Sequence, residues 1–374
     1  MKKALLGIAG FCLAVVSAGA QTQLPNLTDA APAARFALTG KDWPASPGGA
    51  SICLWENDKL AALSITVDDN SASNIDWWLS RADAYGFKMN WNVITSIVGD
   101  GNALHGTWAQ YANVLARGHD VQSHSVTHDN GDAEYRDSQI AIETNLPGHT
   151  CEFIAYPGGS AHPLDPVAAA LYYASARGTG GSLNTANKIA YMNVNATSSP
   201  NLTNTAASWS YLPNLFNSSA TGYRGWSVQI FHWVADYSVY AQPLLDFYDA
   251  NRANLWCGRY GDVAKYGQER DTAVLTTNEN SAARIALSLT DQMLDSRFNY
   301  PLTLKVRLPA SWSNVQAAQN GRAISADVVA YNGGNYALVK AVPDQGEISL
   351  TPTAADFTVF PDSGFVPFTV TFTD

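Results

Sequence analysis

The chain has 374 residues, enough for two or three domains with a sizeable buried core. Only 14% of the residues are charged, and the formal net charge is −10 at pH 7. A surface of this kind disfavours nucleic acids and other polyanions as partners, so we expect no nucleic acid partner.

The first twenty residues have the features of a secretory signal peptide. A basic start (residues 1–3) precedes an apolar run over residues 4–16, and small residues at 18–20 form a cleavage site. The apolar run is too short for a membrane span, and no later stretch offers one. We therefore expect a soluble monomer that is secreted or periplasmic. Residues 21–50 are rich in Pro, Ala and Gly and predict a loosely packed lead-in segment.

Strand and helix patterns alternate over residues 51–275. Alternating or wholly apolar runs predict strands at residues 63–67, 87–95, 120–123, 153–156, 226–233 and 255–257. Helical apolar spacing predicts helices at residues 74–85, 107–117, 132–145, 165–175, 242–251 and 261–269. Residues 178–225 have little periodicity and predict long loops. The alternation predicts a parallel α/β barrel with its active loops at the carboxyl ends of the strands.

A different pattern begins near residue 280. Short alternating runs predict strands at residues 285–290, 302–308, 323–331, 336–342 and 347–350. Together they predict a small β-sandwich domain over residues 280–350. Residues 351–374 are expected to be a truncated start of an immunoglobulin-like module, because 357–374 resemble the opening of a polycystic-kidney-disease-type domain.

Three cysteines remain once the signal peptide is removed. Cys53 and Cys257 could form a disulfide if the first and last barrel strands are neighbours, which would leave Cys151 free. Alternatively, all three are reduced and buried.

Two stretches carry the residues that indicate chemistry. The predicted strand at 63–67 ends in Asp68 and Asp69, and His124 and His128 stand four residues apart after the strand at 120–123. On a helical turn this spacing places both imidazoles on one side, where they can share a metal ion. A carboxylate from the first stretch would complete the ligand set. Taken alone, each stretch has a simpler explanation, since paired aspartates often form a turn or helix cap and an HxxxH spacing is often incidental.

Thr66-Val67-Asp68-Asp69 and His124-Ser125-Val126-Thr127-His128 together resemble two motifs of the polysaccharide deacetylases of carbohydrate esterase family four, the nodulation-factor deacetylase homology domain. The motifs are Thr-Phe-Asp-Asp and His-Ser/Thr-x-x-His, and the resemblance spans residues 50 to 275 approximately. It implies a distorted, incomplete (β/α) barrel. It also implies that Asp69, His124 and His128 bind Zn²⁺, or another divalent transition metal such as Co²⁺, with Asp68 as the general base.

A later segment resembles the family's Leu-x-Ile-x-His motif. It is matched by Val228-x-Ile230-x-His232, which makes His232 the expected general acid. Strand alternation places Val228 and Ile230 on the same face as the histidine. These two residues and Trp226 are assigned to the substrate pocket. A satisfied core histidine is the alternative for His232.

The family's Arg-x-Pro-Tyr/Phe-Gly motif is altered in this chain. Its place is taken by residues 155–159, Ala-Tyr-Pro-Gly-Gly, and the Gly158 N–H is the expected oxyanion donor. The motif's arginine, which orients the catalytic aspartate, is Ala155 here. Arg177 is a candidate substitute, although a surface position would also explain it.

These expectations describe a metal-dependent carbohydrate esterase or deacetylase that removes acetyl groups from a polysaccharide. The bond could be an N-acetyl amide, as in chitin-like or peptidoglycan-like glycans, or an O-acetyl ester, as in acetylxylan. One alternative is a catalytically inactive glycan-binding module on the same barrel. Another is a glycoside hydrolase that uses Asp68 with a second carboxyl group, which leaves the histidine pair unexplained.

Overall fold

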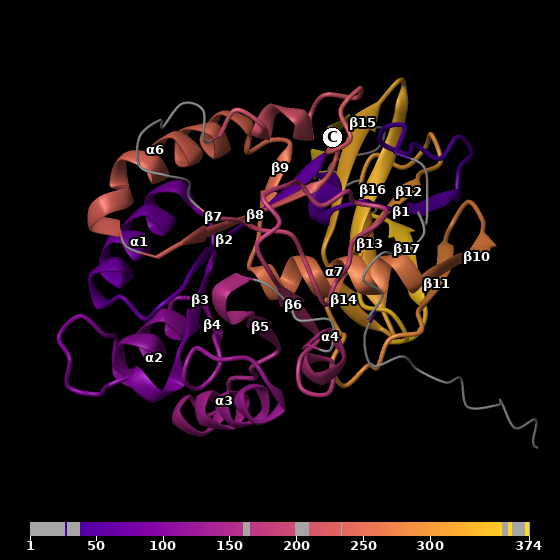
Figure 1. Ribbon diagram of the computed structural model, residues 1–374. Helices are drawn as coiled ribbons and strands as arrows, with labels where there is room; N and C mark the ends of the chain where they lie inside the picture. The colour runs from indigo at the N-terminus through magenta and orange to yellow at the C-terminus, as the bar shows by residue number, and fades with distance from the viewer. Residues whose placement is uncertain are drawn as a thin grey trace, which may run out of the picture.

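The computed structural model describes Leu27 and residues 38–159, 165–198, 209–232, 234–353, 358–360 and 371–373. The expected signal peptide and most of the expected immunoglobulin-like module lie outside these residues. Within them the chain forms a parallel sheet with covering helices and two larger antiparallel sheets (Figure 1), together with a two-stranded antiparallel sheet near the C-terminus. No described helix is both long enough and apolar enough to cross a lipid bilayer.

The parallel sheet follows the order β6-β5-β4-β3-β2-β8-β7, and β9 also pairs with β2. Its strands are β2 (Ala61–Val67), β3 (Asn90–Val93), β4 (Asp120–Ser123), β5 (Phe153–Ala155), β6 (Ser175–Arg177), β7 (Thr197–Ser198), β8 (Trp226–Phe231) and β9 (Leu255–Cys257). Every pairing between them is parallel. The sheet is an incomplete, distorted (β/α) barrel, so the predicted fold class is confirmed.

The outer helices are α1 (Ala72–Tyr85), α2 (Trp108–Ala116), α3 (Asp132–Asn145), α4 (Asp165–Ala169) and α6 (Val234–Asn251). The helix predicted over 165–175 is wrong in its second half, because α4 ends at Ala169 and β6 begins at Ser175. The cause is tertiary: the edge of β5 pairs with β6, and the Ala174 N–H donates to the Glu152 carbonyl at 2.7 Å. Three residues are too few to show a strand period.

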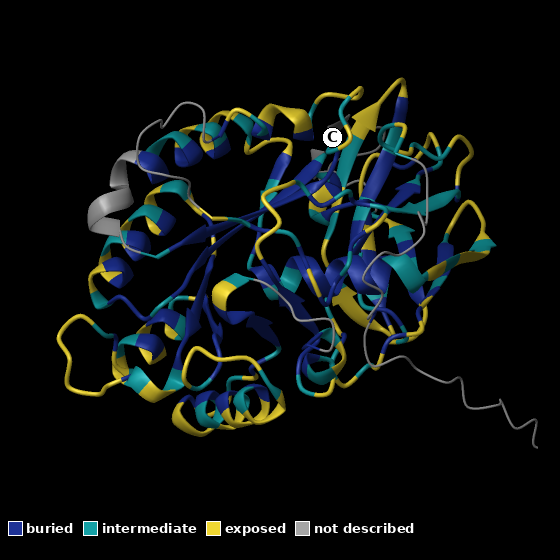
Figure 2. Ribbon diagram, in the orientation of Figure 1, coloured by how far each residue is buried: buried dark blue, intermediate teal, exposed yellow. Residues whose placement is uncertain are grey.

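Both faces of the parallel sheet are buried (Figure 2). On the outer face, Leu63, Ile65 and Val67 of β2 belong to the apolar cluster that includes Trp78 of α1. The inner face is mixed. Apolar side chains such as Val228 fill part of it, while alternate positions of β3, β4 and β6 carry polar side chains.

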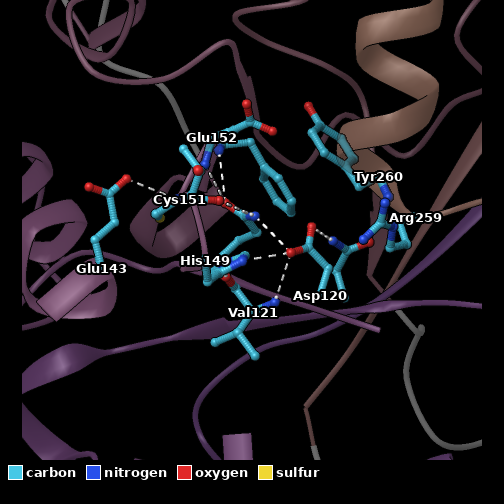
Figure 3. A network of polar contacts seen from close by, with 12 residues as sticks. Asp120, Val121, Glu143, His149, Cys151, Glu152, Arg259 and Tyr260 are labelled. Carbon is cyan, nitrogen blue, oxygen red and sulfur yellow. Dashed lines mark hydrogen bonds and ion pairs between the residues drawn. The ribbon is translucent and has the colours of Figure 1, made fainter. Parts of the chain in front are cut away.

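A polar network around Asp120 lies where β4 begins (Figure 3). The buried carboxylate accepts hydrogen bonds from the Val121 N–H at 3.0 Å, Gln122 Nε2 at 2.9 Å and Asn90 Nδ2 at 2.7 Å. Asn90 Oδ1 in turn accepts the Tyr260 N–H at 2.6 Å. The network ties β3 and β4 to the start of the last barrel helix at the amino ends of the strands.

That helix, α7 (Tyr260–Thr272), lies between the parallel sheet and the antiparallel sheets (Figure 1). It is buried along most of its length, including the charged residues Lys265, Glu269 and Arg270. The helix is joined to the next domain by hydrogen bonds, since the Tyr300 N–H donates to Glu269 Oε1 at 2.9 Å.

The β domain consists of two antiparallel sheets. One has the order β1-β12-β16-β15, with β1 (Ala50–Ile52), β12 (Leu302–Arg307), β16 (Gly334–Ala341) and β15 (Ala326–Tyr331). The other has the order β10-β11-β17-β13-β14, with β10 (Val274–Asn280), β11 (Ile285–Thr290), β17 (Ile348–Pro352), β13 (Val315–Gln319) and β14 (Arg322–Ile324). Residues of both sheets share one buried cluster with the inner face of the barrel. Further along, β18 (Thr358–Phe360) pairs with β19 (Thr371–Thr373).

The expectation of a loosely packed lead-in is wrong for its last residues. β1 pairs with β12, and the Gly48 N–H donates to the Arg307 carbonyl at 2.8 Å. Trp43 stacks on Tyr331 with ring centroids 3.9 Å apart. The segment therefore packs against the β domain, because its aromatic and backbone groups find partners far away in sequence.

Cys53, Cys151 and Cys257, the cysteines of the described residues, are free. Cys53 and Cys257 do not form a disulfide. The alternative of three reduced, buried cysteines holds for Cys53 and Cys151, whereas Cys257 is unpaired but only partly buried.

Candidate metal and catalytic site

The predicted site residues meet where parallel strands end. Asp68 and Asp69 come directly after β2, His124 directly after β4, and His232 directly after β8. Parallel strands bring their carboxyl ends to one edge, and there the structure has a cavity of about 240 Å³. Its lining consists of Asp68, Asp69, His124, His128, Tyr156, Gly158, Gly159, Arg177, Thr179, Ser198, Ile230 and His232.

Asp69, His124 and His128 each offer a ligand atom, and the three atoms lie within 4.8 Å of one another. Asp69 Oδ1 lies 3.5 Å from His124 Nε2 and 3.9 Å from His128 Nε2. Among the described residues, this buried oxygen has no hydrogen-bond partner. His124 Nδ1 lies 2.8 Å from the Ala155 carbonyl, which holds the ring so that Nε2 faces the aspartate. This donor set fits a divalent transition metal such as zinc.

The helical turn expected for the histidine pair is wrong. Residues 124–128 form a bent loop in which Ser125 has φ 67° and His128 has φ 66°. The Ser125 Oγ accepts the Asp129 N–H at 3.1 Å, and the two imidazole centroids are 4.7 Å apart. Left-handed backbone is costly for such residues, and here it is what turns both rings toward Asp69.

Glu134, in the first turn of α3, holds this loop in place. Its Oε2 accepts the Val126 and Thr127 N–H groups, each at 2.8 Å, and its Oε1 accepts the Thr127 hydroxyl at 2.9 Å. Sequence reasoning missed this residue. The available signal was an acidic residue at the start of the helix that follows the histidine motif.

Asp68 is 3% exposed and forms an ion pair with Arg177, which is 1% exposed. Asn92 Nδ2 donates to the same carboxylate oxygen, Oδ1, at 2.8 Å. Burial by itself would raise the pKa of Asp68, but the charges of Arg177, His124 and His232 outweigh it and hold that pKa far below its ordinary value. Asp68 is therefore ionised at neutral pH.

Arg177 is therefore buried against Asp68, as expected of a substitute for the motif arginine, and the alternative of a surface arginine is wrong. Asn92 was missed by sequence reasoning. The signal was present in residues 90–93, Asn-Trp-Asn-Val, where polar residues alternate within a strand that is buried on both faces.

His232 stands across the cavity from the histidine loop. Its Nε2 lies 4.0 Å from Asp69 Oδ2, and its side chain is 30% exposed. The ring is therefore open to solvent on one side, unlike the core histidine considered as the alternative.

Only one of the three expected pocket residues lines the cavity. Ile230 does, whereas Val228 and Trp226 do not, and both are fully buried. Trp226 donates from Nε1 to Ser64 Oγ at 3.1 Å inside the barrel. At strand spacing, Trp226 lies about 20 Å along the chain from His232, so only the last inward residue of β8 reaches the site.

Gly158 lines the cavity in the turn after β5, as expected. It has φ 69° and the next glycine has φ 72°, both in the left-handed region that glycine adopts most readily. The turn places the Gly158 backbone on the side of the cavity formed by β5 and β6.

The fold and site define an incomplete (β/α) barrel with a candidate metal centre at the carboxyl edge of its sheet. No family model matches the chain. It is 39% identical over 350 residues to a gellan lyase of a Bacillus species, an alignment that covers 84% of this chain and 14% of the lyase. The chain thus spans a small part of that curated relative.

Two solved structures are also similar. One is the Streptococcus pyogenes deacetylase PplD in complex with acetate, with 24% identity, a TM-score of 0.33, and coverage of 36% of this chain and 62% of that one. The other is the Bc1960 peptidoglycan N-acetylglucosamine deacetylase, with 15% identity, a TM-score of 0.39, and coverage of 55% and 88%.

Proposed function

We propose that this chain is a metal-dependent hydrolase that removes acetyl groups from a polysaccharide. One observation carries the proposal. A single cavity holds the donor set of Asp69, His124 and His128, the ionised carboxylate of Asp68 and the partly exposed imidazole of His232. The 39% identity to a gellan lyase supports a polysaccharide as the substrate class.

The metal and the other groups that line the cavity each have a proposed role in this reaction. Zn²⁺, when bound, would polarise an acyl carbonyl and make water more acidic. Asp68 is held ionised by Arg177, so it can accept a proton from the attacking water. His232 can donate a proton to the leaving amine or alkoxide, and the Gly158 N–H can stabilise developing negative charge on the acyl oxygen. Ile230 offers an apolar surface for the methyl group.

The metal assignment is tested with His128→Ala. We expect this variant to lose stoichiometric zinc while keeping its fold, because His128 is a ligand on an exposed part of the loop. Bound zinc is measured after gel filtration, and His105→Ala, outside the cavity, is the control. Retained stoichiometric zinc in His128→Ala would show that the ion is held elsewhere.

The role of His232 is tested separately. We expect His232→Ala to keep its metal and to lose about 10²- to 10⁴-fold in kcat, the range for removal of a general acid. Near-normal turnover would place the acid elsewhere.

The substrate is tested by acetate release. Chelated protein, before and after zinc is restored, is offered chitin oligomers and acetylated xylan side by side. Zinc-dependent acetate release supports the proposal, and the preferred substrate distinguishes an amide from an ester. Tightly bound zinc with no release from either substrate would favour the glycan-binding alternative.

The similarity to a gellan lyase supports a second candidate, cleavage of a polysaccharide chain by elimination. Elimination leaves an unsaturated sugar at the new chain end and needs no water. Chain shortening of gellan with formation of unsaturated ends, and without acetate, would favour the lyase over the deacetylase.

A further inference from the structure

A second group of carboxylates lies in the β domain. Asp291 directly follows β11, Asp295 lies four residues further on, and Asp344 lies in the turn between β16 and β17. One carboxylate oxygen from each lies within 4.8 Å of the other two. None of these residues belongs to the candidate active site, so any role of this group is independent of the proposed function.

Backbone hydrogen bonds hold two of these carboxylates in fixed positions. The Asp291 N–H donates to Asp344 Oδ2 at 3.0 Å, and the Met293 N–H donates to Asp291 Oδ1 at 2.8 Å. The Asp344 N–H donates to the Leu289 carbonyl at 3.0 Å, and Asp344 has a left-handed φ of 59°. Hydrogen bonds thus join the loop after β11 to the turn between β16 and β17.

Asp291 is the unusual member of the group. It is only 5% exposed, and its Oδ2 is buried without a hydrogen-bond partner among the described residues. A buried carboxylate oxygen without a partner is strongly unfavourable, and such oxygens in proteins are commonly paired or bound to a cation. Burial and the charges of Asp344 and Asp295 also raise the pKa of Asp291 to about 6, although the Met293 N–H opposes this. The charged groups that shift the pKa of Asp291 are thus both carboxylates.

We propose that Asp291, Asp295 and Asp344 bind a Ca²⁺ ion that links the loop after β11 to the β16–β17 turn. The three side chains supply only oxygen, which suits Ca²⁺ and is poorly suited to transition metals that prefer nitrogen or sulfur. Asp291 Oδ1 and Asp344 Oδ2 already accept N–H groups, so Asp291 Oδ2 and Asp344 Oδ1 are the expected ligand atoms of these two residues. Asp295 supplies the third carboxylate. Water would complete the six to eight ligands that Ca²⁺ takes.

The ion would stabilise more than one turn. The Gln292 N–H donates to Thr272 Oγ1 at 3.5 Å, so the loop that carries two of the ligands contacts the carboxyl end of α7. A cation here would tie the β domain to the helix that separates it from the barrel.

The test uses the full chain, first stripped with chelator and then loaded with zinc so that the active-site donors are saturated. We expect Ca²⁺ to raise the melting temperature saturably by about 3 °C or more, with one bound Ca²⁺ per chain, and Mg²⁺ to have a smaller effect. No Ca²⁺-dependent shift, or an equal shift with Mg²⁺, would overturn the proposal.

Three variants identify the ligands: Asp291→Asn, Asp295→Asn and Asp344→Asn. Asparagine keeps an acceptor oxygen for the backbone N–H groups, so each variant is expected to fold but to lose most of the Ca²⁺-dependent shift. Asp291→Asn has a second signature, because in chelator it should melt no lower than the unmodified chain once the buried charge is gone. Asp327→Asn, at an exposed position of β15, is the matched control. If all three variants keep the full shift, these residues do not bind the ion.

Discussion

At the scale of single residues, the environment of Asp68 decides what the site can do. Burial by itself raises the pKa of Asp68 and so favours the protonated form, which cannot accept a proton from water. Arg177 reverses this by placing a full positive charge against it, and Asn92 fixes the oxygen that faces the arginine. The ionised state of Asp68, on which its proposed role as proton acceptor rests, therefore depends on a residue outside the sequence motifs.

Arg177→Gln tests this dependence. With the arginine removed, burial is opposed only by the charges of His124 and His232, so the pKa of Asp68 rises. The acidic limb of the kcat/KM profile should then move to higher pH, and activity at neutral pH should fall by about 10²-fold or more. The pH–rate profile measures both.

Arg177→Lys is the control, since it keeps the charge and should keep the acidic limb closer to that of the unmodified chain. Removing one partner of a buried ion pair costs about 3–5 kcal/mol, so the fold of Arg177→Gln is checked by circular dichroism at the assay temperature. An unmoved acidic limb in a folded Arg177→Gln variant would contradict this account of Asp68.

At the scale of elements, the position of the candidate metal ligands depends on how a loop is attached to a helix. β4 delivers His124, but the loop beyond it adopts left-handed backbone at Ser125 and His128. Such strain persists only where neighbouring groups enforce it. The carboxylate of Glu134 does so from α3, through its hydrogen bonds to two backbone N–H groups of the loop.

Glu134→Ala should weaken metal binding by about 10- to 100-fold, the range seen when groups that support metal ligands are removed. Competition with a chromophoric chelator measures the affinity. Asp137→Ala, at an exposed position on the same helix, should leave the affinity unchanged. Equal affinities for the two variants would mean that the loop holds its shape without Glu134.

At the scale of the whole molecule, α7 joins the barrel to the β domain and brings buried charged residues into that junction. Glu269 accepts the Tyr300 N–H on Oε1, while its Oε2 is buried without a hydrogen bond from any described residue. Burial raises the pKa of Glu269 well above its ordinary value, and the negative charges of Asp291 and Asp295 raise it further. The Tyr300 N–H and the positive charge of Lys265 lower the pKa but do not outweigh burial. Folding therefore favours the neutral form of this side chain.

This pKa shift predicts a pH dependence of stability. The unfolded chain ionises Glu269 above its ordinary pKa, whereas the folded chain resists ionisation. The contribution to stability is therefore complete below that ordinary pKa and is lost as the pH rises through the raised folded pKa. Glu269→Gln keeps the shape without titrating. In chelator, its stability should fall less steeply with rising pH, by up to about 1.4 kcal/mol per pH unit.

Thermal melts across the pH range measure this slope. Asp262→Asn removes another carboxyl group of α7 whose pKa is raised by burial, so it is the comparison for the size of the change in slope. If the stabilities of Glu269→Gln and of the unmodified chain fall with the same slope as the pH rises, Glu269 is already ionised in the folded state.

Local patterns were enough to predict several elements. The predicted bounds of β4, α3 and β11 agree with the structure, because each has an uninterrupted period and clear turn residues at its ends. β6 and β1 were not predicted, since three residues carry no period and their strand geometry comes from the neighbouring β5 and β12. Trp226 was wrongly assigned to the substrate pocket for a related reason. Alternation predicts which face of the sheet a side chain occupies, but not how far along the strand the cavity extends.

The amino-acid sequence by itself determined the class of fold and the residue types available for metal binding and proton transfer, because both follow from short-range periodicity and from spacing within motifs. Only the tertiary structure decided that Arg177 neutralises Asp68, that Glu134 holds the histidine loop, and that Asp291, Asp295 and Asp344 meet. Each of these contacts joins separate elements or loops. Their geometry depends on how the strands and helices pack, which no local pattern encodes.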